Sequence, residues 1–268
     1  MILKITGRDN KTLKFVKSLK RKSVRTKERQ FVAEGKKIVL EALKYVPELV
    51  RLVVITEDFA KKEQMCVKMA ESVCDRVLEV SDSAFLDISD TDTPQGILAV
   101  LEMPDKEFAA HKNSQDIIVL DGVSEPGNMG TIIRTAEALG FDGIYLMKGC
   151  TDIFSSKTVR STMGSVFRMK FKTECTLCDI EKLKDMGFSV ISTTPVGDTV
   201  LEKMDIPKKA AVVIGNEAHG VCDEVLKLSD FKVKITMDGL AESLNAAIAA
   251  GIAMHWIKNS CTNRIKDF

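Results

Sequence analysis

Two short apolar runs near the carboxyl end restrict the fold of this chain most strongly. They span residues 211–214 and 233–235, and each is followed directly by a polar turn. Their length and their content of branched residues are typical of buried strands in a parallel sheet. Open α/β sheets bind ligands outside the carboxyl ends of their strands. The two turns therefore mark the edge of the sheet at which we expect a ligand.

The sequences of these turns suit a ligand-binding loop, although ordinary strand-to-helix loops have similar compositions. The first turn reads GNEAHG, in which Gly215 and Gly220 can take a positive φ or let the backbone approach a ligand closely. The second turn, TMDGLAES, precedes an Ala-rich stretch that predicts a helix over residues 244–257. Ser243 or Glu242 is the expected N-cap of this helix.

Length and composition are those of an ordinary globular protein. The 268 residues are 45% hydrophobic and 29% charged, which allows one large domain or two modest ones. No signal peptide is visible and no apolar stretch could span a bilayer, so we expect a cytoplasmic protein with no membrane partner. The seven cysteines are expected to be reduced thiols. Cys175 and Cys178 form a CxxC pair without a second pair at zinc-ribbon spacing, so we predict no metal site.

Alternating strand and helix patterns divide the chain into two predicted α/β domains. Residues 1–104 form the first, residues 105–115 lose the apolar periodicity and are the expected linker, and residues 116–268 form the second. Strands are predicted in the first domain near residues 31–35, 52–55, 77–80 and from 97. In the second domain, strands are predicted at residues 117–120, 143–147, 166–171 and 188–193, before the two runs described above.

Positive charge is concentrated at the amino end, although the whole chain has a net charge of only +1. Residues 1–30 contain eleven Lys and Arg residues against two acidic ones, a net charge of +9. We predict a helix capped by Asn10, followed by a segment too charged to pack. Solvated helices also carry such charge, but this excess favours a surface that binds RNA or another polyanion. The residues predicted to bind RNA are Lys17, Lys20, Arg21 and Arg25.

A glycine-rich stretch, DGVSEPGNMGTIIRTAEALG, begins at Asp121 and predicts a helix from Asn128. Unpaired backbone N–H groups at such a helix start suit a phosphate or another polar ligand. The glycines do not form GxGxxG and no GK[ST] follows, which disfavours a Rossmann oxidoreductase and a P-loop enzyme. Arg134 follows on the same helix, where a surface or ion-pairing role is as compatible with the sequence as a functional one.

Three motifs, in this order, resemble those of the SpoU/TrmH family of RNA ribose 2′-O-methyltransferases. They are the stretch that begins at Asp121, SSKTVRSTMGSVFRM from Ser155, and the run from GNEAHG through ITM to ESLNAAIA. The segments KSLKRKSVRTKERQFVAEGKKIVLEAL and TPQGILAV also look like the ribosomal-protein-like substrate-binding domain that precedes the catalytic domain in many members. The resemblance covers nearly the whole chain.

The resemblance implies a SPOUT-type parallel-sheet domain with a deep trefoil knot, S-adenosylmethionine as cofactor, and a homodimer whose subunits complete each other's sites. The cofactor-binding positions it implies are Gly215, Ile235, Leu244 and, on the same pocket, Met237, Thr193 and Thr194. The reaction-site positions are Asn128, Arg134, Glu217, Ser243 and Asn245. Thr236, Glu125 and Thr162 depart from the residues common in the family without removing a side chain that the chemistry needs. We expect a valine at Gly215 to abut the cofactor and abolish its binding.

The implied reaction aligns a ribose 2′-OH with a sulfonium methyl group and removes one proton. A guanidinium hardly deprotonates in a protein, so we expect Arg134 to hold phosphate or stabilise the developing alkoxide, while Glu217 or water accepts the proton. The domain architecture favours ribosomal RNA as substrate. Transfer RNA remains an alternative, as does a non-catalytic RNA-binding protein with this fold, which the presence of Arg134 and Asn245 disfavours.

Overall fold

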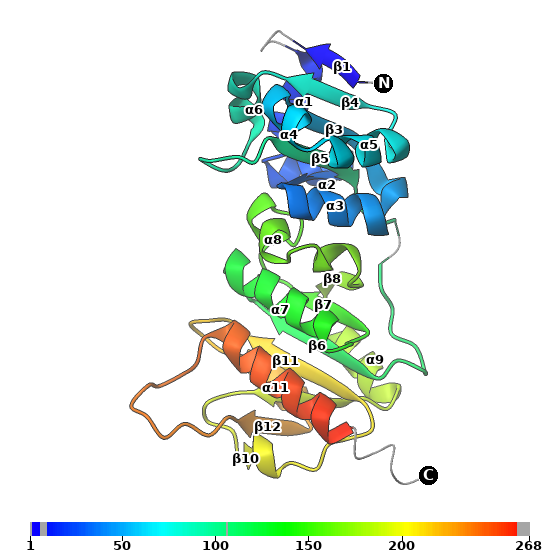
Figure 1. Cartoon of the computed structure of the whole chain (residues 1–268). Helices are drawn as coiled ribbons and strands as arrows, with labels where there is room; N and C mark the ends of the chain where they lie inside the picture. Colours follow the sequence, from blue (N-terminus) through cyan, green and yellow to red (C-terminus); the bar gives the residue numbers. More distant parts are fainter. Residues whose placement is uncertain (1, 6–9, 106, 262–268) are drawn as a thin grey trace. The chain divides into compact units, whose positions relative to one another are not determined.

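The computed structural model describes residues 2–5, 10–105 and 107–261, with residues 260 and 261 as backbone only (Figure 1). Arg8, part of the cationic run, lies outside the described residues. Contacts divide the chain into two compact units. Unit 1 comprises Met1–Asp105 and Asp152–Arg168, and unit 2 comprises Lys106–Thr151 and Met169–Phe268. The division therefore places a segment from the middle of the expected second domain in unit 1.

Unit 1 contains a five-stranded mixed sheet with the order β1-β4-β3-β5-β2. β3, β4 and β1 pair in parallel, whereas β5 is antiparallel to β3 and β2. The strands are β1 (Ile2–Ile5), β2 (Gln30–Glu34), β3 (Val50–Thr56), β4 (Val77–Val80) and β5 (Ile97–Glu102). The helices are α1 (Lys11–Ser18), α2 (Lys22–Glu28), α3 (Lys36–Tyr45), the 3₁₀ helix η1 (Pro47–Leu49), α4 (Glu57–Lys62), α5 (Gln64–Val73) and α6 (Asp82–Ile88).

The helix α1 forms as its sequence predicts. The Asn10 side chain accepts a hydrogen bond from the backbone N–H of Thr12 at 2.8 Å, which confirms the expected N-cap. Leu13, Val16 and Leu19 recur every three residues and are all buried in the core of unit 1. This spacing leaves the intervening lysines on the solvent side of the helix.

Residues 152–168 are an integral part of unit 1, and they contain α8 (Ser156–Ser161) and the 3₁₀ helix η2 (Ser165–Phe167). The ring of Phe154 packs on the ring of Phe31 in β2, with centroids 4.7 Å apart. Three pairs of arginine and carboxylate add to this packing: Arg25 with Asp152, Arg160 with Glu34, and Arg168 with Glu41. The strand predicted at residues 166–171 is wrong in position, because η2 occupies its first half and strand β8 begins only at Phe171.

Arg25 differs most from its expected role. The segment predicted not to pack forms α2, and Arg25 is only 5% exposed. Its guanidinium donates to the carbonyl oxygens of Leu19 and Lys20 at 2.8 Å each, and to Asp152 at 2.5 and 3.1 Å. A buried charge is tolerated when it is paired and fully hydrogen-bonded. Arg25 is therefore not available to contact RNA in this structure.

Unit 2 contains a seven-stranded sheet with the order β10-β12-β9-β11-β6-β7-β8, in which every pair is parallel. The strands are β6 (Asp116–Asp121), β7 (Gly143–Met147), β8 (Phe171–Cys175), β9 (Ser189–Thr193), β10 (Thr199–Val200), β11 (Ala210–Gly215) and β12 (Phe231–Lys234). The helices are α7 (Pro126–Ala138), α9 (Leu177–Asp185), the 3₁₀ helix η3 (Leu201–Lys203), α10 (Asp223–Leu228) and α11 (Ala246–Cys261).

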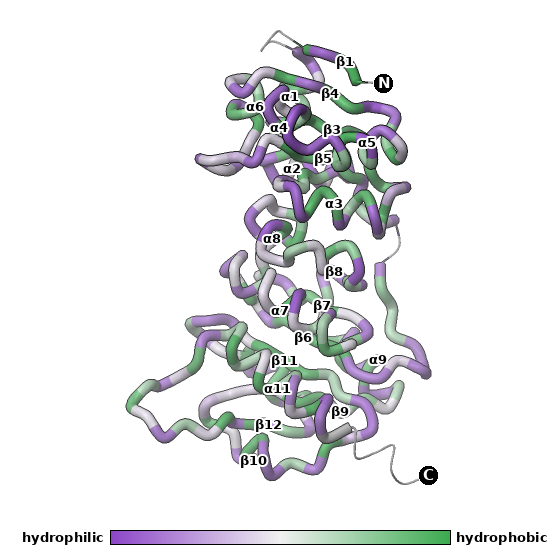
Figure 2. Tube along the Cα trace, viewed as in Figure 1, coloured by the Kyte–Doolittle hydropathy of each residue, from purple (hydrophilic) through white to green (hydrophobic). Residues whose placement is uncertain are grey.

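The central strands β6 and β11 are buried along their whole length, and Figure 2 shows them as mainly hydrophobic. Ile180, Leu183 and Val225 from α9 and α10 cover one face of the sheet. On α7 and α11, which lie side by side, apolar residues such as Ile133 and Met254 are fully buried. In the part of the chain that the structure describes, no helix is long and apolar enough to cross a membrane.

The expected linker, residues 105–115, belongs almost entirely to unit 2. The backbone N–H of Phe108 donates to the carbonyl of Phe171 at 2.7 Å, at the edge of the sheet. Its ring lies so close to Gly143 that a Cβ there would be 2.1 Å from a ring carbon. This segment lacks periodicity because it follows the edge strand β8 as irregular backbone rather than forming a helix or strand of its own.

Candidate cofactor pocket and reaction site

The turn after β11 is built by a close approach of the backbone to itself. The N–H and C=O groups of Asn216 and Gly220 form two hydrogen bonds of 2.9 Å. A Cβ at Gly215 would lie 2.1 Å from the carbonyl carbon of Gly220, whereas Gly220 itself has a φ of +70°. Both glycines are thus required by the turn. We expected a valine at Gly215 to abut the cofactor. The valine side chain would instead collide with the backbone of Gly220 before it reached a ligand.

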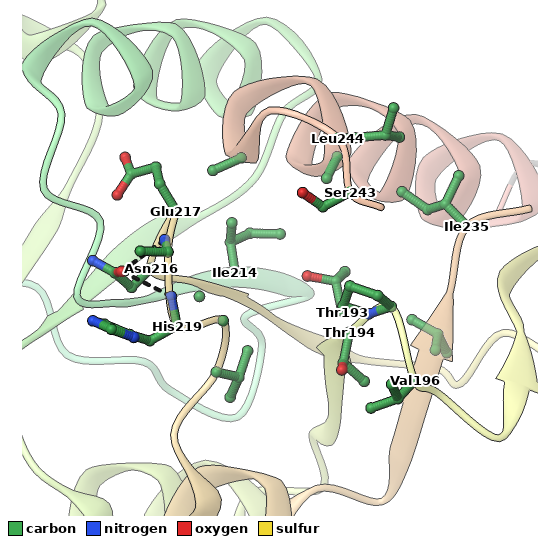
Figure 3. Close-up of a pocket in the computed structure, with 18 of the residues that line it drawn as sticks. Thr193, Thr194, Val196, Ile214, Asn216, Glu217, His219, Ile235, Ser243 and Leu244 are labelled. Carbon is green, nitrogen blue, oxygen red and sulfur yellow. Dashed lines mark hydrogen bonds between the residues drawn. The ribbon is translucent and has the colours of Figure 1, made fainter. Parts of the chain in front are cut away.

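A cavity of about 420 Å³ opens at the carboxyl ends of β9, β11 and β12 (Figure 3). All six residues predicted to bind the cofactor line it: Thr193, Thr194, Gly215, Ile235, Met237 and Leu244. Figure 3 shows Glu217 and His219 on the opposite side from Thr193 and Ile235. The position agrees with the expected ligand-binding edge of an open parallel sheet. The cavity is also lined by Val196, Asn216, His219 and Asp223, which were not predicted as site residues from the sequence.

Glu217 is the centre of a hydrogen-bond network beside the cavity. Its carboxylate accepts from the N–H and the hydroxyl of Ser124 at 3.1 and 3.0 Å, from the N–H of Glu125 at 3.2 Å, and from the side-chain amide of Asn128 at 2.9 Å. Partial burial raises the pKa of Glu217, but these hydrogen bonds outweigh it and lower the pKa to about 2. Glu217 is therefore an anion at neutral pH, and its pKa makes it a weak proton acceptor.

Asn245 extends this network to the last helix. Its side-chain N–H donates to the amide oxygen of Asn128 at 2.9 Å. Its own amide oxygen accepts from the backbone N–H groups of Ala247 and Ile248 at 2.9 and 3.3 Å. Asn245 is thus the N-cap of α11, and the expectation of Ser243 or Glu242 is wrong. One side chain caps the helix and fixes the orientation of the Asn128 amide.

Ser243 and Arg134 are predicted site residues that take no part in this hydrogen-bond network, and only Ser243 lines the cavity. Ser243 is exposed and lines the cavity. Arg134 is exposed on α7, the helix that begins beside Asn128, and it does not line the cavity. Among the residues that the structure describes, it makes no hydrogen bond or ion pair. A free, exposed guanidinium on α7 is compatible with a phosphate contact.

Asn216 and Ser124, which were not predicted as site residues from the sequence, connect the turns around the site. The side chain of Asn216 donates to the carbonyl of Gly122 at 2.7 Å and accepts from the N–H groups of Ala218 and His219. It thereby joins the turn after β11 to the turn after β6. Ser124 supplies two of the donors to Glu217. Both residues lie within the motifs, but their partners are distant in sequence.

The cysteines and acidic residues of the described part offer no metal centre. No group of three or more His, Cys, Asp or Glu side chains that could hold a metal is present among the described residues. Burial raises the pKa of the Cys150 thiol to about 11 and that of Cys175 to about 12. Both thiols are protonated at neutral pH, so neither is a reactive thiolate.

The sequence model of the SpoU rRNA Methylase family matches residues 115–255, more than half of the chain. The chain belongs to this family. The MRM3-like substrate binding domain matches residues 10–99. Membership agrees with the parallel α/β sheet of unit 2 and with the order of the three motifs.

Similar proteins of this family match along nearly the whole chain. The 23S rRNA (guanosine(2553)-2′-O)-methyltransferase RlmP of Bacillus subtilis (strain 168) is 32% identical over 254 residues, which cover 95% of this chain and 98% of that protein. The AdoMet-bound rRNA methyltransferase from Sinorhizobium meliloti superposes with a TM-score of 0.85 at 31% identity, covering 96% of this chain and 98% of that one. A TrmH-family protein described as a putative RNA methyltransferase from Porphyromonas gingivalis has a TM-score of 0.81 at 30% identity, covering 92% and 96%.

Proposed function

We propose that this SpoU-family chain transfers the methyl group of S-adenosylmethionine to a ribose 2′-hydroxyl of ribosomal RNA. The observation that carries the proposal is the cavity at the carboxyl ends of β9, β11 and β12, beside the network of Glu217, Asn128 and Asn245. Two similar proteins support the proposal. One is a 2′-O-methyltransferase of 23S rRNA at 32% identity, and the other is an AdoMet-bound rRNA methyltransferase of known structure at 31% identity.

The residues of the cavity fit S-adenosylmethionine. A volume of about 420 Å³ lies within the range typical of cofactor sites. Ile214, Ile235 and Leu244 supply apolar surface suited to an adenine ring, and Thr193 and Thr194 supply hydroxyls next to it. The bound cofactor would supply a methyl group attached to a cationic sulfur, which is already electrophilic. The protein then has mainly to orient the ribose 2′-oxygen towards this methyl group.

Asn128, Glu217 and Asn245 are positioned to orient the ribose. Because Glu217 holds one side of the Asn128 amide and Asn245 the other, that amide has one fixed direction. We assign Asn128 and Ser243 to contacts with the acceptor nucleotide, and Glu217 and Asn245 to the support of Asn128. Arg134 would bind the phosphate of the acceptor nucleotide and stabilise negative charge that develops on the 2′-oxygen.

The proton of the 2′-hydroxyl is transferred to water in this mechanism. Of the two acceptors expected from the sequence, Glu217 has a pKa of about 2 and is held by four donors, so it is a poor base. The bound cofactor would supply the methyl group to the 2′-oxygen, and its sulfur would keep the electron pair of the S–C bond. The sum of charges is preserved, because one proton is released while the sulfonium becomes a neutral thioether.

Unit 1 would bind the RNA through cations on α1 and in the turn between α1 and α2. Lys17 and Arg21 are exposed, and the family model of a substrate-binding domain matches this part of the chain. Lys20 is exposed as a residue, although its ammonium group donates to the carbonyl of Ser89. Such cations bind phosphate without reading sequence. The choice of nucleotide must therefore depend on other contacts.

We also propose the homodimer and the trefoil knot that the resemblance implies, with the exposed face of α7 and α11 as the dimer interface. Ile248 is 55% exposed and Ile252 38% exposed on one side of α11. Side chains of this kind on adjacent turns are typical of a protein interface. Arg134 is exposed on the neighbouring helix α7, so a second copy seated here would lie next to the reaction site. Cytoplasmic localisation follows from the proposed substrate.

The proposed function is tested with radiolabelled S-adenosylmethionine and ribosomal RNA purified from cells that lack the protein. We expect label in the RNA fraction, and mapping of ribose methylation should locate it at a 2′-oxygen. Transfer RNA from the same cells is the comparison substrate. Label in transfer RNA alone would overturn the choice of ribosomal RNA, and absence of cofactor binding by calorimetry would support the non-catalytic alternative.

A further inference from the structure

The residues that line the cavity are unbalanced in charge. Glu217 and Asp223 are the two carboxylates among them, and no lysine or arginine of the described chain lines the cavity. The remaining lining residues are apolar or uncharged polar side chains, apart from His219. Two carboxylates in a lining without a lysine or arginine favour a positively charged ligand.

The proposed cofactor and its product differ in charge. S-adenosylmethionine has a sulfonium, an ammonium and a carboxylate group, and therefore a net charge of +1. S-adenosylhomocysteine, which remains after methyl transfer, has lost the sulfonium charge and is neutral. The two molecules are otherwise almost the same size. Electrostatic interaction with the wall of the cavity is thus a means to distinguish them.

We propose that Asp223, together with Glu217, makes this pocket selective for the cationic cofactor over its neutral product. The inference rests on the proposed function and adds to it a basis for product release. Each methyl transfer removes the charge that the two carboxylates stabilise, so the product is bound more weakly than the cofactor. The selection acts in the pocket itself and does not require RNA.

The two carboxylates contribute in different ways. Glu217 is held by four hydrogen bonds that stabilise its charged form, so its charge is constant over the physiological range. It also supports Asn128, and its substitution would disturb the reaction site. Asp223 is an exposed residue in the first turn of α10, and no side-chain hydrogen bond of the described residues involves its carboxylate. Asp223 is therefore the residue at which the charge can be removed without breaking the network.

The test is calorimetric binding of S-adenosylmethionine, S-adenosylhomocysteine and sinefungin, an analogue with an amine in place of the methylated sulfur. At low ionic strength we expect the wild-type chain to bind the two cationic ligands about three- to tenfold more tightly than the neutral product. Asp223→Asn should reduce this ratio about two- to threefold, through weaker binding of the cationic ligands alone. The ratio should also fall as salt is added, because exposed charges are screened.

Glu224→Gln is the matched control, because Glu224 is the next residue of α10, is exposed, and does not line the cavity. It should leave the ratio unchanged. Equal binding of all three ligands by the wild-type chain would overturn the inference, as would an equal loss of affinity for all three in Asp223→Asn. Absence of binding of every ligand would instead contradict the proposed cofactor, so the two failures are distinguishable.

Discussion

Arg134 and Glu217 are two charged residues of the proposed reaction site, and their surroundings are opposite. Arg134 is exposed and has no partner among the described residues, whereas the Glu217 carboxylate is held by four donors. A free cation can follow a mobile phosphate, while a fixed anion can only position its neighbours. These surroundings agree with the phosphate contact expected of Arg134, but they disfavour Glu217 as the proton acceptor, which was one of the two acceptors expected from the sequence.

If Arg134 acts as a positive charge, Arg134→Ala should reduce the methylation rate by about two to three orders of magnitude, the loss typical of an electrostatic stabiliser. Arg134→Lys should recover part of this activity, because lysine keeps the charge but lacks the planar fork that binds phosphate through two bonds. Single-turnover assays measure the rate, and calorimetry should show unchanged cofactor affinity. Full activity of the alanine variant would show that Arg134 is an ordinary surface residue with no role in the reaction.

The stability of Glu217 in its charged form predicts a pH effect on folding. A carboxyl whose folded pKa is about 2, below its ordinary value of 4.5, stabilises the fold above the ordinary value and loses this contribution as pH falls towards 2. Acid unfolding of Glu217→Gln should therefore show a smaller decrease of stability between about pH 4.5 and 2 than the wild type. The measurement is chemical denaturation at several pH values. Identical pH dependence in the two proteins would mean that the network does not hold a charged carboxylate.

At the scale of elements, α1 and α2 show that neighbouring cations can have unrelated roles. In α1 the buried Leu13, Val16 and Leu19 direct the lysines to solvent, whereas in α2 Arg25 points into unit 1 and binds Asp152. A count of charges in the sequence treats these cations alike, because it contains no information on which face of each helix is buried by the rest of the fold. Only the packing of residues 152–168 within unit 1 distinguishes the buried Arg25 from the exposed lysines of α1.

We expect the triple substitution of Lys17, Lys20 and Arg21 by glutamine to weaken RNA binding and flatten its salt dependence, by about one unit of the log-log slope for each phosphate that is no longer neutralised. The matched control replaces Lys61, Lys62 and Lys68, three exposed lysines of α4 and α5, by glutamine. Filter binding at several salt concentrations measures the slope. Equal effects of the two triple variants would indicate a general charge effect and no binding face on α1.

For the whole molecule, the two units are not two consecutive stretches of chain. Residues 152–168, which contain all but the last residue of the motif that begins at Ser155, group with unit 1, and the chain then returns to unit 2 at Met169. A fragment of residues 1–105 lacks Asp152, so Arg25 would be buried without its partner. The stability of unit 1 should therefore depend on a segment that follows the first two strands and the first helix of unit 2.

Asp152→Ala in the full chain tests this dependence. Because it leaves the Arg25 guanidinium buried and unpaired, we expect a loss of about 3 kcal/mol in the free energy of unfolding. Asp105→Ala is the control, since its ion pair with Arg29 is 3.7 Å long and both side chains are largely exposed. Such a pair contributes at most about 1 kcal/mol. Urea denaturation compares the variants, and equal stability would show that the segment is not anchored by this pair.

Much of the fold and part of the lining of the cavity could be predicted, because they depend on local patterns. Runs of branched residues indicated the positions of β11 and β7, and the motifs indicated all six pocket residues that were named. The errors have physical causes. Ser243 was expected as a cap because it precedes the Ala-rich run, but Asn245 reaches the free N–H groups of the helix from a position nearer its start.

The class of fold, the order of the motifs and the family could be recognised from the amino acids alone, because each is encoded by residues close together in the chain. The burial of Arg25, the placement of residues 152–168 and the low pKa of Glu217 became apparent only from the folded chain. Each depends on a partner tens of residues away: Arg25 on Asp152, and Glu217 on Ser124 and Asn128. Charge and hydrogen bonding act through space, so the role of an ionised side chain follows from what the fold places next to it.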